Sequence, residues 1–86
     1  MNTQVNTQAS QAYNARTGAV FVKGEPVLIA RESDFRDFME EAPAEKVHSL
    51  RASLELAISQ FGEARSVACD LLRQRLREVR SHIQSA

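Results

Sequence analysis

The sequence predicts a small α+β domain that is mostly helical, in which a flexible tail precedes a short β-hairpin, a short helix and one long amphipathic helix. Apolar residues recur at helical spacing from Val47 to Ile83, which indicates the long helix. Two short runs of strand-favouring residues flank a turn signal earlier in the chain, which indicates the hairpin. A chain of 86 residues buries only about 60–65% of its unfolded surface, so we expect self-association to complete its core.

Residues 1–17 are expected to form the flexible tail, and residues 18–86 the single folded domain. The tail is a degenerate polar repeat whose only charged residue is Arg16. It has too little apolar surface to offset the entropy lost on ordering. An alternative is that its few apolar residues add a short helical turn on a partner.

The hairpin is predicted from two apolar runs, at 19–22 and 27–30, that surround Gly24 and Pro26. Gly24 supplies the positive φ that a tight turn requires. Pro26 has no amide donor, so it belongs in the turn or at the start of the second strand. Because an isolated hairpin is only marginally stable, we expect it to lie on the helices or to pair with another chain through an open edge.

A short amphipathic helix is predicted between Ser33 and Pro43. Ser33 is a good N-cap, and Asp34 places a negative charge in the first turn. Four apolar residues share one face of this helix: Phe35, Phe38, Met39 and Ala42. Pro43 disfavours helical geometry in the residue before it and is tolerated at the start of a new helix, so we expect the chain to bend there.

The long helix is predicted from a stripe of apolar residues: Val47, Leu50, Leu54, Ile58, Phe61, Ala68, Leu72, Leu76, Val79 and Ile83. With Arg65 occupying one position of the stripe, the mean spacing is about 3.6 residues, the period of a straight α-helix. Gly62 is the one expected weak point, since a glycine inside a helix costs about 1 kcal/mol relative to alanine. The spacing continues through Gly62, which favours a continuous helix. The alternative is a helical hairpin of 44–61 against 63–84, which would complete a self-contained three-helix bundle.

Such a long stripe cannot be buried by the short chain that remains, so a helical homodimer is expected. The residues expected at its interface are Leu50, Leu54, Ile58, Phe61, Arg65, Leu72 and Val79. A charge such as Arg65 within an apolar seam is costly unless it is paired, and its known use is to fix register or oligomeric state. Either its partner comes from another element or chain, or the seam opens to solvent and the aliphatic stem of Arg65 lies across neighbouring apolar residues.

The charges balance overall, with 11 basic and 11 acidic residues, but they are unevenly distributed. Residues 31–46 are mainly acidic, and residues 65–83 are mainly basic. Arg73, Arg77 and Arg80 stand at positions i, i+4 and i+7, so they form one row along the helix, where like charges repel. Three kinds of negative surface would relieve this repulsion: the acidic region of a second copy, an acidic patch on a different protein, or nucleic-acid phosphate. The plain alternative is a solvated arginine face.

The residues expected to contact a partner protein are Arg73, Arg75, Leu76, Arg77 and Arg80. The leading hypothesis is a non-enzymatic protein–protein interaction module that binds a second protein with an acidic surface stoichiometrically, as a regulator or inhibitor. One alternative is a nucleic-acid-binding protein that uses Arg73, Arg75, Arg77 and Arg80 on phosphates, against which the zero net charge argues. Another is a structural subunit of a larger assembly. No motif points to a family, and the polar leader with a motif-free body is typical of accessory proteins of bacterial mobile elements such as phages, which often block host proteins.

No catalytic, metal or cofactor site is predicted. His48 and His82 fall at opposite ends of the predicted long helix, where they cannot share a metal. Cys69 lies at helical spacing among apolar residues and is expected to be a small buried residue rather than a reactive thiol. The three glycines are too far apart for a phosphate-binding loop. A single cysteine and the lack of a signal-peptide or membrane-spanning pattern favour a cytoplasmic protein.

Overall fold

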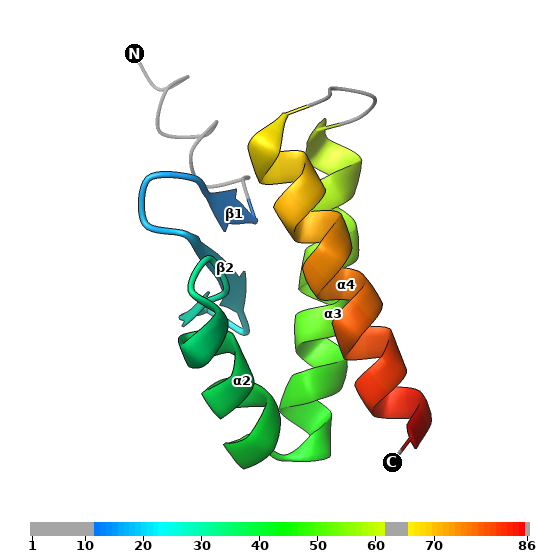
Figure 1. Ribbon diagram of the computed structural model, residues 1–86. Helices are drawn as coiled ribbons and strands as arrows, with labels where there is room; N and C mark the ends of the chain where they lie inside the picture. The colour runs from blue at the N-terminus through cyan, green and yellow to red at the C-terminus, as the bar shows by residue number, and fades with distance from the viewer. Residues whose placement is uncertain (1–11, 62–65, 86) are drawn as a thin grey trace.

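The computed structural model describes residues 12–61 and 66–85, which form a three-stranded antiparallel sheet and three helices (Figure 1). The strands lie in sequence order across the sheet: β1 (Tyr13–Asn14), β2 (Ala19–Val22) and β3 (Glu25–Leu28). The helices are α2 (Glu32–Glu41), α3 (Ala44–Phe61) and α4 (Val67–Ser85). The predicted class, α+β with mostly helix, is confirmed.

The predicted hairpin is present as β2 and β3, joined by a two-residue turn. Lys23 and Gly24 both have positive φ, 53° and 83°, which is the type I′ geometry that matches the twist of paired strands. The turn pairs Val22 with Glu25, so the second strand begins two residues earlier than the predicted 27–30.

A third strand, β1, lies where the sequence predicts a flexible tail. Tyr13 pairs with Val20 across the sheet, and its side chain is buried in the core. The Phe21 amide also donates a hydrogen bond of 3.0 Å to the Ala12 carbonyl. The apolar surface of this segment is too small to offset the entropy lost when it becomes ordered. Pairing with the hairpin supplies the missing stabilisation. The rest of the predicted tail, residues 1–11, lies outside the described residues.

Gly18 closes the β1–β2 turn in a position that only glycine fits. Its φ is +77°, and a Cβ added there would lie 2.5 Å from the Ala30 Cβ. Its carbonyl accepts hydrogen bonds from the amides of Ile29 and Ala30, at 2.9 and 3.2 Å. The approach of Ala30 to this turn therefore fixes the end of the hairpin against the turn before it.

We expect Gly18→Ala to lower the free energy of unfolding by about 2 kcal/mol, because the backbone strain adds to the clash with Ala30. Gly24→Ala is the matched control, since Gly24 also has positive φ but nothing lies within 4 Å of its added Cβ. It should cost only about 1 kcal/mol. Urea unfolding followed by circular dichroism measures both values, and equal losses would contradict the packing argument.

Helix α2 begins one residue before the predicted N-cap. Arg31 occupies the capping position, with no side-chain capping bond, and Ser33 lies inside the helix. The helix ends at Glu41 because Pro43 holds Ala42 in extended geometry, with ψ at 146°. The predicted bend before Pro43 is confirmed.

The prediction of one continuous long helix is wrong, because the structure has two helices, α3 and α4, in its place. Helices α3 and α4 run side by side in opposite directions (Figure 1). The alternative hairpin is the better description, and its first segment, 44–61, has the bounds of α3. Ser66 supplies the start signal for α4, since its Oγ accepts a 3.1 Å hydrogen bond from the Cys69 amide. Gly62, the suggested break, lies outside the described residues.

The core lies between the inner face of the sheet and the α3–α4 pair, and α2 covers it at β3 (Figure 1). Four residues of the expected dimer interface are fully buried in this core: Leu50, Leu54, Leu72 and Val79. Ile58 and Phe61 are half-buried and pack against the same core. These residues are buried by the folding of one chain on itself, and not between two chains as expected. Arg65, its charged member, lies outside the described residues.

No helix in the described ranges is long and apolar enough to cross a membrane.

Candidate protein-binding surface

Two of the five residues expected to contact a partner are instead buried inside the molecule. Arg75 is only 5% exposed, and Leu76 is 7% exposed. The Arg75 Nε donates a 2.7 Å hydrogen bond to the Ile29 carbonyl, and its terminal nitrogen pairs with Glu78 at 3.1 Å. Its guanidinium carbon lies 5.0 Å from the centre of the Phe35 ring, within cation–π range. Arg75 therefore connects α4 to the end of β3 and to α2, and it belongs to the fold.

Arg80 is exposed, but its charge is already compensated. It forms an ion pair with Glu55 of α3 at 3.0 Å, and Arg51 pairs with the same carboxylate at 3.0 Å. The hydrogen bond from Arg80, helped by that from Arg51, lowers the pKa of Glu55 below its ordinary value. The pair contributes its full stabilisation above the ordinary glutamate pKa and loses it as the pH falls through the lowered pKa, and because the Glu55 side chain is 38% exposed the contribution is small. The main consequence is positional, since Glu55 holds Arg80 along the α3–α4 boundary.

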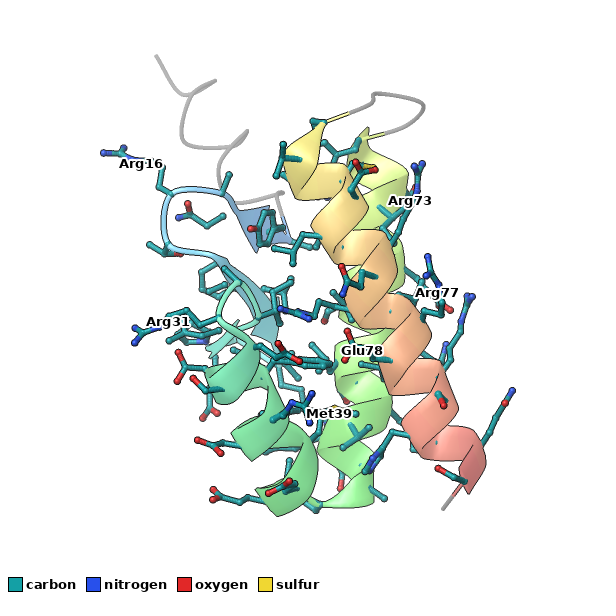
Figure 2. The ribbon with its side chains drawn as sticks, viewed as in Figure 1. Arg16, Arg31, Met39, Arg73, Arg77 and Glu78 are labelled. Atoms are coloured by element: carbon teal, nitrogen blue, oxygen red, sulfur yellow. The ribbon has the colours of Figure 1, made fainter. Side chains whose placement is uncertain are left out.

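Arg73 and Arg77 are the two predicted contact residues that stay exposed and uncompensated. Within residues 12–61 and 66–85, no carboxylate forms an ion pair with either side chain. Figure 2 shows both pointing away from α2, on the opposite side of the molecule from Arg31. We call Arg73, Arg77 and Arg80 the arginine surface.

Most other cations of the described chain are paired. Four ion pairs join α2, α3 and the hairpin turn to nearby carboxylates: Lys23 with Glu45, Lys46 with Glu25, Arg31 with Asp34, and Arg36 with Glu32. Free charge of the opposite sign remains on α2, where Asp37, Glu40 and Glu41 form no ion pair with any described residue. The fold therefore separates an uncompensated basic surface on α4 from an uncompensated acidic surface on α2.

The fold brings together two histidines that the sequence places far apart. Because α3 and α4 are antiparallel, His48 near the start of α3 and His82 near the end of α4 line the same pocket, of about 320 Å³. The prediction that they are separated is wrong, since it assumed one continuous helix. Among the described residues, no group of three or more His, Cys, Asp or Glu side chains is placed to hold a metal ion. Cys69 is fully buried, as predicted.

Sequence reasoning missed the pairing of Arg80 with Glu55 and the burial of Arg75. The first depends on α3 and α4 lying antiparallel. The second had a signal, because residues two apart on a helix do not share a face, and this separates Arg75 from both Arg73 and Arg77. No protein-family model, no curated protein and no solved structure matches the chain.

Proposed function

We propose that this protein is a non-enzymatic interaction module that binds an acidic surface of a partner protein stoichiometrically, as a regulator or inhibitor. The observation that carries the proposal is the exposed pair Arg73 and Arg77, one helical turn apart, for which the described chain supplies no ion-pair partner. Arg80 extends the same row, and its pair with Glu55 fixes its position.

The energetics favour an anionic partner. Arginines four residues apart on a helix repel each other by a few tenths of a kcal/mol. Carboxylates of a partner would neutralise this repulsion and attract both arginines. Guanidinium groups also pair with carboxylates in a bidentate geometry that gives both strength and orientation. Leu56, which follows Glu55 on α3 and is 54% exposed, offers apolar area that such an interface can bury.

Nucleic acid is the weaker candidate for this surface. Of the four arginines that the alternative would use on phosphates, Arg75 is buried and Arg80 is paired with a carboxylate. The remaining two charges, on a chain with no net charge, supply little of the electrostatic term that dominates non-specific DNA binding. Self-association through the apolar stripe is not part of the proposal, because its central residues form the core.

We expect Arg73→Glu/Arg77→Glu to weaken binding of the natural partner at least about tenfold, since each change replaces an attraction with a repulsion. The charge-matched control is Arg31→Glu/Arg36→Glu, which changes the net charge equally at the start of α2. Immobilised protein is used to capture partners from a lysate of the source cell, and bound species are identified by mass spectrometry.

One protein retained by the wild type and by the control, but lost with Arg73→Glu/Arg77→Glu, would support the proposal. Equal retention by all three forms would contradict it. Retention of nucleic acid that nuclease treatment abolishes would favour the alternative.

A further inference from the structure

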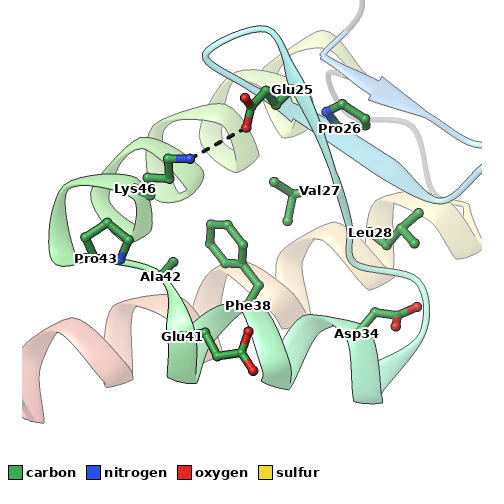
Figure 3. A pocket seen from close by; sticks show the side chains of 10 residues that line it. All are labelled: Glu25, Pro26, Val27, Leu28, Asp34, Phe38, Glu41, Ala42, Pro43 and Lys46. Carbon is green, nitrogen blue, oxygen red and sulfur yellow. Dashed lines mark ion pairs between the residues drawn. The ribbon is translucent and has the colours of Figure 1, made fainter.

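A groove of about 450 Å³ lies between β3 and α2, and Glu41, one of the uncompensated acids, lines it (Figure 3). The side chains of Val27 and Leu28 line one wall, and Phe38 of α2 faces them across the groove. Phe38 is half-buried and Leu28 is 41% exposed, so apolar surface remains open to a ligand. The groove is large enough for one bulky apolar side chain of a peptide together with its flanking backbone.

The open edge of β3 does not favour addition of another strand. The pairs Val22–Glu25 and Val20–Val27 alternate with Phe21–Pro26 and Ala19–Leu28. A type I′ turn is closed by a hydrogen-bonded pair, which is Val22–Glu25 here, and such pairs alternate along the two strands. The backbone N–H and C=O groups of Glu25 and Val27 therefore point toward β2. Those at positions 26 and 28 point toward the open edge of the sheet. Pro26 has no amide to donate, which leaves only the Leu28 amide for an incoming strand. A ligand of this groove is therefore held mainly through its side chains.

The rim of the groove is acidic. Glu25, Asp34 and Glu41 line it, against one cation, Lys46. Lys46 is already engaged with Glu25 at 3.6 Å (Figure 3), and Asp34 with Arg31 at 3.6 Å, whereas Glu41 forms no ion pair with any residue that the structure describes. The groove therefore complements a positively charged ligand.

Glu41 is also placed at a cost to the fold. It is the last residue of α2, and the last turn of this helix holds no basic residue. The carbonyl end of a helix carries partial negative charge, so a carboxylate there is unfavourable. The local cost would be removed by a cation bound next to Glu41.

We propose that this groove binds a cationic peptide segment of a partner protein, in which one large apolar side chain is flanked by arginine or lysine residues. The apolar side chain packs between Leu28 and Phe38, and the flanking cations face Glu41 and Asp34, where one of them takes the place of Arg31. This site is separate from the arginine surface and takes a ligand of opposite charge. The chain thus carries two interaction surfaces and can bridge an acidic partner and a basic one.

The test is an NMR titration of the ¹⁵N-labelled full chain with the peptide acetyl-Arg-Arg-Phe-Arg-Arg-amide. We expect saturable shifts of backbone amides in β3 and in the second half of α2. The acidic counterpart, acetyl-Glu-Glu-Phe-Glu-Glu-amide, should not bind. The peptide acetyl-Arg-Arg-Gly-Arg-Arg-amide, which lacks the apolar side chain, should bind at least about fivefold more weakly, since burial of an aromatic side chain contributes more than 1 kcal/mol.

Glu41→Lys separates binding from folding, because a lysine at the end of α2 suits the helix dipole and should leave stability unchanged or higher. We expect it to weaken the peptide at least about fivefold. Asp70→Lys is the matched control, an equal charge change at an exposed acid of α4 that forms no ion pair with a described residue, and Arg73→Glu/Arg77→Glu tests independence from the arginine surface. Both should retain binding.

Three outcomes would overturn the proposal. The first is equal binding of the basic and acidic peptides, and the second is unchanged affinity in Glu41→Lys. The third is concentration-dependent association of the chain without peptide that Arg73→Glu/Arg77→Glu abolishes, since the groove would then hold a second copy of the chain. Failure of this titration leaves the arginine surface untouched, because none of its residues lines the groove.

Discussion

Arg75→Ala is expected to lower the free energy of unfolding by about 3–4 kcal/mol. The change leaves the Ile29 carbonyl without its 2.7 Å donor and removes the partner of Glu78. It also removes the guanidinium that lies 5.0 Å from the centre of the Phe35 ring. Three elements lose their common contact, so the loss should far exceed that of a surface arginine.

Two further variants define the origin of this effect. Arg73→Ala removes the same side chain from the exposed face of the same helix, and its effect should stay within about 0.5 kcal/mol. Arg75→Met keeps most of the buried aliphatic volume and should lie between the two alanine variants. Urea unfolding monitored by circular dichroism measures all three. Similar losses for Arg73→Ala and Arg75→Ala would mean that Arg75 is not a buried connector.

Leu72→Ala is expected to cost about 3–4 kcal/mol, because Leu72 is fully buried in the core and its truncation leaves a cavity that the neighbouring helices fill only in part. Leu56→Ala, at a 54% exposed position of α3, should cost less than about 0.5 kcal/mol. The urea midpoints of both variants should not depend on protein concentration. A midpoint that rises with concentration would show that Leu72 is buried between two chains, as a dimer interface requires.

The sequence predicts the hairpin, its turn and the bend before Pro43 from local preferences. Residues 19–22 form β2 with the predicted bounds, Gly24 has positive φ, and the chain bends before Pro43. Each of these features depends on backbone preferences that neighbouring residues determine. The burial of Cys69 is predictable in the same way, from its helical spacing among apolar residues.

The long-range arrangement needed the structure. The apolar period of α3 continues into α4 without a change of phase, so spacing alone does not distinguish one straight helix from two that pack on each other. Ser66 is a start signal inside that pattern, recognisable once its Oγ is seen to accept the Cys69 amide. Strand β1 was missed because Tyr13 gains its burial from the neighbouring hairpin and not from its own segment.

The candidate site was predictable in part for the same reason. Helical spacing places Arg73 and Arg77 on one face, and the structure leaves both exposed. Spacing does not reveal that Arg80 meets Glu55, because that contact crosses from one helix to another. The groove beside β3 is also formed by segments that only the tertiary fold brings together.

The central claim is that the arginine surface contacts an acidic partner protein directly, and site-specific photo-crosslinking tests it most directly. Two forms of the full chain carry p-benzoylphenylalanine, one in place of Ser81, an exposed residue one helical turn after Arg77, and one in place of Arg31 on the far side of the molecule from Arg77 (Figure 2). After irradiation in a lysate of the source cell, we expect position 81 to give one cross-linked protein in a one-to-one adduct, attached within an acidic segment. Position 31 should not give this adduct. Cross-links from position 81 to nucleic acid or to a second copy, or the same protein cross-linked equally from both positions, would contradict the claim.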